Sequence, residues 1–161
     1  MLVLSFDVGI KNLSYCLLNS DGEQIIKWEL VTLEINSREK DKICLNLINK
    51  LDSIPDLLTA DRVLIEKQPS FNPTMRIIAG CLQTYFLIRG VIDGNSIKRV
   101  IIYSPTHKLK CYTGPPFEVK GSTKYARTKK TGILHCEYII SNNVMNASWV
   151  EFFKKCKKKD D

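Results

Sequence analysis

Apolar residues along this chain gather in short runs, and the first three runs fit β-strands. Residues 2–7, 12–19 and 24–33 are rich in Val, Ile, Leu and aromatic side chains, and Ser-Asp-Gly at 20–22 is a typical turn. Strands joined by short connections pair antiparallel, so these three are predicted to form a meander.

Two later runs, residues 62–66 and 97–103, predict buried strands. Their consecutive aliphatic and β-branched residues are typical of strands covered on both faces. Helical spacing of apolar residues predicts helices before, between and after these strands, and strands that alternate with helices form sheets covered on both sides. The predicted fold class is therefore α/β, a mixed five-stranded sheet with helices on both faces.

The predicted helices have recognisable start signals. The first is expected to end before Pro55, the second spans 73–92, and the last two span 123–141 and 147–158. The expected N-caps of the first three are, in chain order, Asn36 or Ser37, Asn72 and Ser122.

The helix at 73–92 is apolar almost all round, whereas a surface helix buries one stripe. We expect one side to pack on the sheet and the other on a second copy of the protein, giving a homodimer. A central helix covered by its own chain is the alternative. Arg76, Gln83, Arg89 and the helix length argue against a membrane span. The expected dimer-interface residues are Ile78, Leu82, Tyr85, Phe86 and Arg89.

Two predicted strands end in an acid, Asp7 and Glu66. A carboxylate at the end of a buried strand loses hydration unless a cation or hydrogen bonds compensate it. Oxygen ligands without a His or Cys cluster favour Mg²⁺ or Mn²⁺, and two such ions activate water for phosphodiester hydrolysis. The alternatives are a turn acid for Asp7 and an ion pair with Lys67 for Glu66. Asp160 and Asp161 are a further ligand source or a solvated tail.

The balance of charge is basic, with 24 Lys and Arg against 17 Asp and Glu in 161 residues, a net charge of +7. A basic domain of this size favours nucleic acid or another anionic partner, with a solvated basic face as the alternative. Lys108 and Lys110 follow a strand end near the expected metals. The expected DNA-binding residues are Lys11, Lys67, Lys110, Lys120, Lys124, Tyr125, Arg127, Lys129 and Lys130.

Six cysteines are scattered without a C-x-x-C pair, which argues against a zinc site. Met1 runs directly into the first strand, without the pattern of a signal peptide. We therefore expect an intracellular protein with reduced thiols.

Three segments, residues 3–12, 63–69 and 158–161, resemble the RuvC-like Holliday junction resolvases. They read VLSFDVGIKN, VLIEKQP and KKDD, and the resemblance covers essentially the whole chain. It is strongest to the resolvases of poxviruses and other large DNA viruses, with the fungal mitochondrial resolvases as a second branch. Either of the first two motifs alone is weak, but together they are fairly specific.

The resemblance implies an RNase H-like fold, a homodimer, and two-metal cleavage of branched DNA by paired nicks. Asp7 and Glu66 match the first two metal-binding acids of the family, and its functional lysine falls on Lys108, with Lys110 as the alternative. A viral protein of this kind is expected in the host cytoplasm, and a mitochondrial one is the alternative.

The family's site ends in a helix that begins Asp-Asp-x-x-Asp. Asp161 matches the first ligand of that pair, with Asp160 beside it, and the second ligand would follow three residues later. We therefore expect a single domain over 1–161 that lacks its C-terminal helix, binds metal poorly and cuts slowly or not at all.

Two other function classes fit parts of the sequence. Sugar-kinase and actin-like ATPases also begin with strand-Asp-x-Gly, but they need a second phosphate-binding motif and a Gly-rich adenosine loop, which this sequence does not contain. A non-catalytic branched-nucleic-acid-binding module is the remaining alternative.

Overall fold

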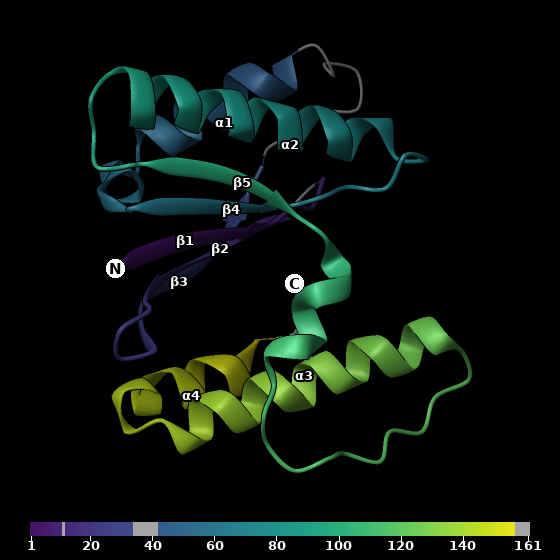
Figure 1. The fold of residues 1–161 in the computed structure, drawn as a ribbon. Helices are drawn as coiled ribbons and strands as arrows, with labels where there is room; N and C mark the ends of the chain where they lie inside the picture. The colour runs from purple at the N-terminus through teal and green to yellow at the C-terminus, as the bar shows by residue number, and fades with distance from the viewer. Residues whose placement is uncertain (11, 34–41, 157–161) are drawn as a thin grey trace.

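The computed structural model describes residues 1–10, 12–33 and 42–156, and they build one five-stranded sheet. Its strands are β1 (Leu2–Asp7), β2 (Asn12–Asn19), β3 (Gln24–Thr32), β4 (Arg62–Glu66) and β5 (Arg99–Tyr103). The order across the sheet is β3-β2-β1-β4-β5 (Figure 1). The first three strands pair antiparallel, and β4 and β5 are parallel to β1. The predicted mixed sheet is confirmed.

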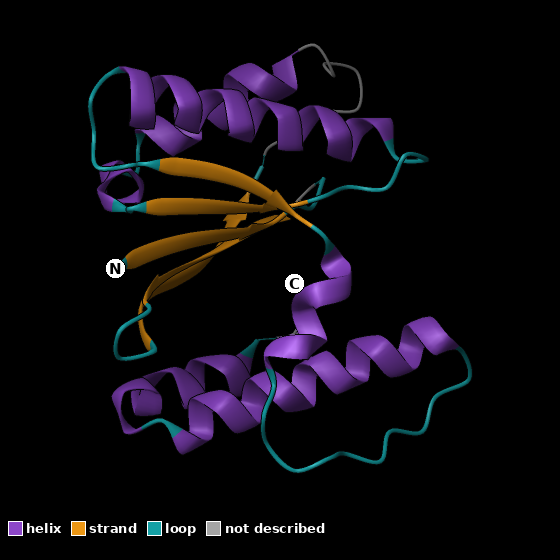
Figure 2. Ribbon diagram, in the orientation of Figure 1, coloured by secondary structure: helices purple, strands orange, loops and turns teal. Residues whose placement is uncertain are grey.

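Helices cover both faces of this sheet (Figure 2). On one face lie α1 (Ile43–Asp52) and α2 (Pro73–Tyr85), which continues as a π-helical segment, η3 (Phe86–Ile92). On the other lie α3 (Lys124–Asn142) and α4 (Ala147–Lys155). Three short 3-10 helices complete the elements of the described residues: η2 (Pro55–Thr59), η4 (Pro105–Cys111) and η5 (Val144–Asn146).

The main core lies between the sheet and α1 and α2. Leu4 and Phe6 of β1 and Val63 and Ile65 of β4 are almost fully buried there, and Phe6 packs on Phe86 with ring centroids 5.3 Å apart. Successive residues of a strand point to opposite faces of the sheet. The residues that alternate with these four along β1 and β4 therefore face α3 and α4.

The α3–α4 layer is attached to the sheet through β3. The ring of Trp28 contacts Trp149, Phe152 and Phe153 at centroid distances of 5.6–6.5 Å. Asn146 is 1% exposed; its Oδ1 accepts from the Ile25 amide at 2.7 Å. These contacts fix the helical layer to the β2–β3 hairpin.

Most predicted boundaries agree with the structure. Asn72 caps α2 as expected, its Oδ1 accepting from the Met75 amide at 3.2 Å. The cap of α3 is Thr123 and not Ser122, because the extended backbone of Thr123 lets its hydroxyl accept from Ala126 at 3.1 Å. The expected start of the first helix at 36–37 lies outside the described residues. All six cysteines are free thiols, as predicted.

The expected interface on the helix at 73–92 needs correction. Ile78, Leu82, Tyr85 and Phe86 are at most 5% exposed within the protomer, because they form the stripe that packs on the sheet. The stripe facing away from the sheet is apolar too, with exposed fractions of 40–75%. Its large members are Ile77, Leu87, Ile88, Val91 and Ile92.

Among the described residues, the helix Pro73–Ile92 is long and apolar enough to cross a membrane by length and composition, with a mean hydropathy of 1.3. Core helices of water-soluble proteins meet the same criterion. The packing of Leu82 and Phe86 against the sheet assigns this helix to the core of the fold.

Candidate active site

Asp7 and Glu66 end two neighbouring parallel strands. Phe6 of β1 pairs with Ile65 of β4, so the next residues, both acidic, stand side by side at the carboxyl edge of the sheet. Phe6 and Ile65 point into the main core, and both carboxylates therefore face the α3–α4 side. The sheet register brings the two predicted acids together.

Lys108 joins this pair from η4, the helix that follows the adjacent strand β5. Its Nζ lies 3.3 Å from Asp7 Oδ2 and 3.3 Å from Glu66 Oε2. The side chains are 27% exposed for Asp7, 13% for Glu66 and 43% for Lys108, so the group is accessible from solvent. Of the two lysines considered from the sequence, Lys108 contacts the acids, whereas Lys110 is exposed on η4.

The acid pair has a perturbed charge balance. Burial, together with the hydrogen bond and charge of Asp7, raises the pKa of Glu66 to about 7, although Lys108 opposes the shift. Burial lowers the pKa of Lys108, but the two carboxylates outweigh it and the net direction is upward. Lys108 is therefore firmly cationic at neutral pH, while Glu66 is close to its titration midpoint.

Two residues beside the acids were not expected from the sequence. Ser14 of β2 pairs with Asp7 across the sheet, and Tyr103 of β5 pairs with Glu66. Ser14 is 6% exposed. Burial raises the pKa of Tyr103 to about 12; Lys108 lowers it, whereas the two acids raise it. Tyr103 is the last residue of its strand, as the two acids are of theirs, and this is its one signal in the sequence, although it does not place Tyr103 beside the acids.

Two carboxylates converge on one ammonium group, so the site already holds a positive charge between oxygen donors. Such a donor set suits a hard divalent cation. Mg²⁺ is commonly held by one or two carboxylates, with water and substrate phosphate completing its coordination. Within residues 1–10, 12–33 and 42–156, no group of three His, Cys, Asp or Glu side chains forms a metal cluster. Asp160 and Asp161, the other expected ligands, lie outside the described residues.

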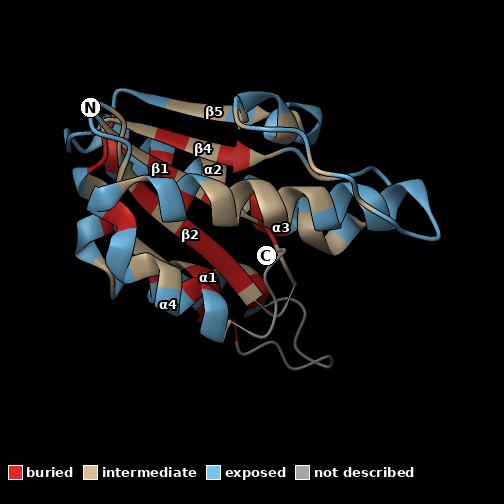
Figure 3. Cartoon of the chain, turned by 90° about the horizontal axis from the view of Figure 1, so that it is seen from below, coloured by how far each residue is buried: buried red, intermediate tan, exposed pale blue. Residues whose placement is uncertain are grey.

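The expected DNA-binding residues lie mostly on one side of this site. Lys67 directly follows Glu66 and is exposed. Figure 3 shows the exposed end of α3 and the loop before it extending beyond the sheet. Exposed on η4, this loop and α3 are Lys110, Lys120, Lys124, Tyr125, Arg127, Lys129 and Lys130. Lys11 lies outside the described residues.

Three solved structures of resolvases have a fold similar to that of this chain. The chain aligns with a fowlpox virus resolvase, solved with substrate Holliday junction DNA, at a TM-score of 0.60 and 24% identity, covering 100% of this chain and 89% of that one. For Thermus thermophilus RuvC the values are 0.60 and 14%, covering 96% of both chains. For the yeast mitochondrial Holliday junction resolvase Ydc2 they are 0.60 and 16%, covering 98% and 72%. The fold is RNase H-like.

The sequence comparisons identify the family. The chain belongs to the family described as poxvirus A22 protein, whose model matches residues 1–161. It is also 38% identical over 128 residues to an uncharacterized protein of Acanthamoeba polyphaga mimivirus. That match covers 72% of this chain and 30% of the relative, so the chain spans less than a third of its length.

Proposed function

We propose that this protein is a metal-dependent endonuclease that cuts four-way and other branched DNA. The observation that carries the proposal is the contact of Lys108 with both Asp7 and Glu66 at the accessible carboxyl edge of an RNase H-like sheet. Membership of the poxvirus A22 family and likeness to resolvases solved with junction DNA support the substrate class.

In the proposed mechanism Asp7 and Glu66 hold Mg²⁺ or Mn²⁺, with Asp160 and Asp161 as further ligand candidates. Such ions supply an activated water and stabilise charge on the phosphate. Glu66 must be ionised to bind a cation, so its raised pKa makes metal affinity increase as the pH rises through about 7. Lys108, cationic and 43% exposed, is placed to hydrogen-bond the scissile phosphate as negative charge develops.

The proposed DNA contacts use the basic residues next to this site. Residues 110–130 contain six cationic side chains and one acidic one, so they carry five of the seven net positive charges of the chain. Cations on an exposed helix and loop neutralise backbone phosphates without reading sequence. This arrangement fits a substrate recognised by its shape.

The proposed assembly is a homodimer, because paired nicks at a junction require two active sites. The exposed apolar stripe of α2 and η3 is the surface that a second copy would cover. Gly80 and Thr84 are exposed on the same stripe, and nothing lies within 4 Å of the position of a Cβ on Gly80. Small residues there let two helices approach closely.

Residues 1–161 are proposed to form one RNase H-like domain of a viral protein that acts in the host cytoplasm. The family match over the whole of this range and the mimivirus relative support this assignment.

The substrate class is tested with end-labelled DNA. A four-way junction and linear duplexes of the same arm sequences are incubated with excess protein in Mg²⁺, in Mn²⁺ and in EDTA. We expect metal-dependent nicks close to the branch point of the junction and no comparable cutting of the duplexes. Equal cutting of both substrates, or cutting in EDTA, would contradict the proposal.

A further inference from the structure

The connection between η4 and α3 is ordered although it has no regular structure. This η4–α3 loop (residues 112–123) follows the helix that holds Lys108 and leads into the exposed basic end of α3. Irregular loops of this length are usually either functional or mobile. Half-buried Tyr112, Gly114, Phe117 and Val119 alternate with exposed residues, which indicates that one side of the loop is packed.

An aromatic clamp, consisting of Tyr112, Phe117, His135 and Tyr138, supplies this packing. The rings of Tyr112 and His135 stack 3.8 Å apart with an interplanar angle of 11°. Tyr138 meets Tyr112 edge-on at 5.5 Å, and Phe117 lies 5.7–6.2 Å from the other three rings. Two rings come from the loop and two from α3, so the clamp joins these segments.

His135 is present here as a stacking ring. Its Nδ1 is buried and, unlike other buried side-chain nitrogens and oxygens of the described residues, has no hydrogen-bond partner. Burying such an atom costs free energy, and burial lowers the pKa of His135. An uncharged aromatic ring is therefore what the site uses, and phenylalanine would provide the same stacking.

Other contacts shape the loop around the clamp. The Tyr112 hydroxyl donates to the Pro115 carbonyl at 2.9 Å, and a Cβ on Gly114 would collide with the rings of Tyr112 and Tyr138. At the far end, Arg127 Nη1 donates to the Gly121 carbonyl at 2.9 Å. The loop is thus held to α3 at both ends.

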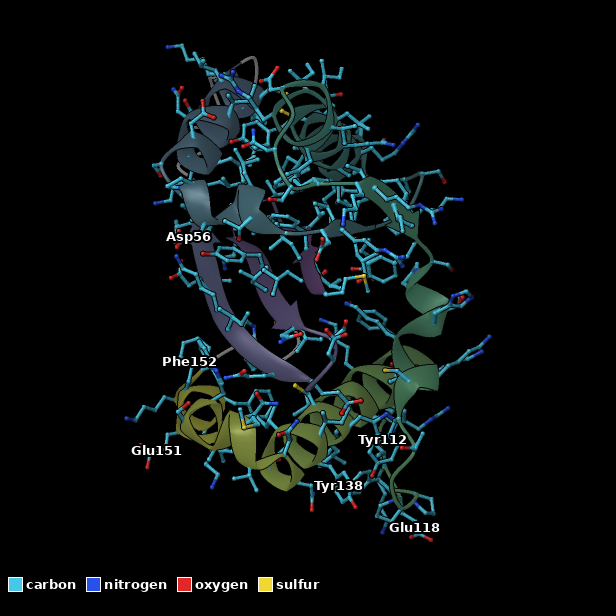
Figure 4. All side chains as sticks on the ribbon, turned by 60° about the vertical axis from the view of Figure 1, so that its left-hand side comes forward. Asp56, Tyr112, Glu118, Tyr138, Glu151 and Phe152 are labelled. Atoms are coloured by element: carbon cyan, nitrogen blue, oxygen red, sulfur yellow. The ribbon has the colours of Figure 1, made fainter. Side chains whose placement is uncertain are left out.

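The fixed loop holds one cationic side chain in a defined place. Lys120 lies within it, and Lys110 and Lys124 flank it, all exposed. Its single acid is Glu118, which Figure 4 shows beyond Tyr112 and Tyr138 at the outer end of the loop. Ordering a loop during binding consumes binding free energy, whereas a loop that is already ordered does not have this cost.

We propose that the aromatic clamp is a positioning device for DNA, which holds the η4–α3 loop so that Lys120 and the first turns of α3 contact phosphates of a duplex arm leading away from the acid pair. This inference rests on the proposed function and adds to it the packing that holds the DNA-binding segment in place. The clamp residues themselves do not touch the reacting atoms.

The test compares His135→Ala with His135→Phe. We expect His135→Ala to weaken junction binding in EDTA roughly tenfold and to reduce the slope of log Kd against log salt by about one, because Lys120 no longer contacts DNA. His135→Phe should bind like the wild type. At saturating protein with Mg²⁺, both should cut at the wild-type rate. Trypsin should cleave after Lys120 faster in His135→Ala than in the wild type or in His135→Phe.

Tyr112→Ala tests the same clamp from the loop side and should behave like His135→Ala. The inference would be overturned if trypsin cleaved the loop of an alanine variant faster and that variant still bound the junction with wild-type affinity. Weakened binding in His135→Phe would also overturn it. Loss of the folded state in both alanine variants, measured by circular dichroism, would also overturn it, because the rings would then belong to the general core. Wild-type protein that binds neither junction nor duplex would instead refute the proposed function.

Discussion

At the scale of single residues, Glu66 has the most unusual environment of the candidate site. Its pKa of about 7 lies well above the ordinary value of 4.5 because burial and Asp7 both favour the protonated form. Between these two pH values the folded protein holds a proton that the unfolded chain has lost, so stability falls as the pH rises.

This linkage is measurable by urea unfolding in EDTA at pH 5 and pH 7.5. The quantity to compare is the free energy of unfolding of the wild type minus that of Glu66→Gln. This difference should be smaller at pH 7.5 than at pH 5, because the variant has no proton to lose at this position. His135 titrates in both proteins, so its contribution cancels in the difference. A difference that does not change with pH would contradict the account of Glu66.

Lys108 is the second residue with a measurable role. Its ammonium group competes with a divalent ion for the same two carboxylates, so Lys108→Met should bind Mn²⁺ several-fold more tightly by calorimetry. The same change should slow junction cleavage about a hundredfold or more, because a cation near the phosphate is lost. The matched control is Lys110→Met, which removes an exposed lysine of the same helix. Equal effects of the two variants would exclude a specific role for Lys108.

Asp7, Glu66 and Lys108 could be predicted as site residues from the sequence. Two predicted strands end in an acid, and the resemblance to the resolvase family indicated the lysine. The sequence was not sufficient for Ser14 and Tyr103. Their place beside the acids depends on the register of four strands, which is set by long-range pairing and not by local pattern.

At the scale of elements, the helix formed by α2 and η3 explains why the expected dimer-interface residues had to be corrected. Two of its stripes are apolar, and periodicity alone does not say which of them faces the sheet. The structure places Leu82 and Phe86 inside and Leu87 and Val91 outside. Similarly, the aromatic clamp was not expected, because Tyr112 and His135 are separated by a loop whose path the sequence does not define.

The exposed stripe makes a prediction about association. Val91→Asp should convert the proposed dimer to a monomer in sedimentation velocity at micromolar concentrations, since it places a charge in an apolar contact. Val144→Asp is the control, because Val144 is an apolar residue 90% exposed on the α3–α4 side. A wild-type protein that sediments as a monomer, or a Val91→Asp protein that remains a dimer, would refute the interface.

At the scale of the whole molecule, the fold gives the two helical layers different tasks. The layer of α1 and α2 completes the main core and leaves an apolar stripe on its outer side. The layer of α3 and α4 carries most of the net positive charge and lies on the face to which the acid pair points. Branched DNA bound on that side would meet the acids and the basic loop together, while the opposite side remains available for a second copy.

The proposed active site is tested by measuring junction cleavage by Asp7→Asn and Glu66→Gln, with binding measured in parallel. Under single-turnover conditions in Mg²⁺, each variant should cut at least about a thousandfold more slowly than the wild type, because each loses a metal ligand, yet bind the junction in EDTA at least as well. Asp56→Asn, which changes an acid 66% exposed and away from the site, should cut normally. Wild-type cleavage rates in Asp7→Asn or Glu66→Gln would contradict the proposed active site.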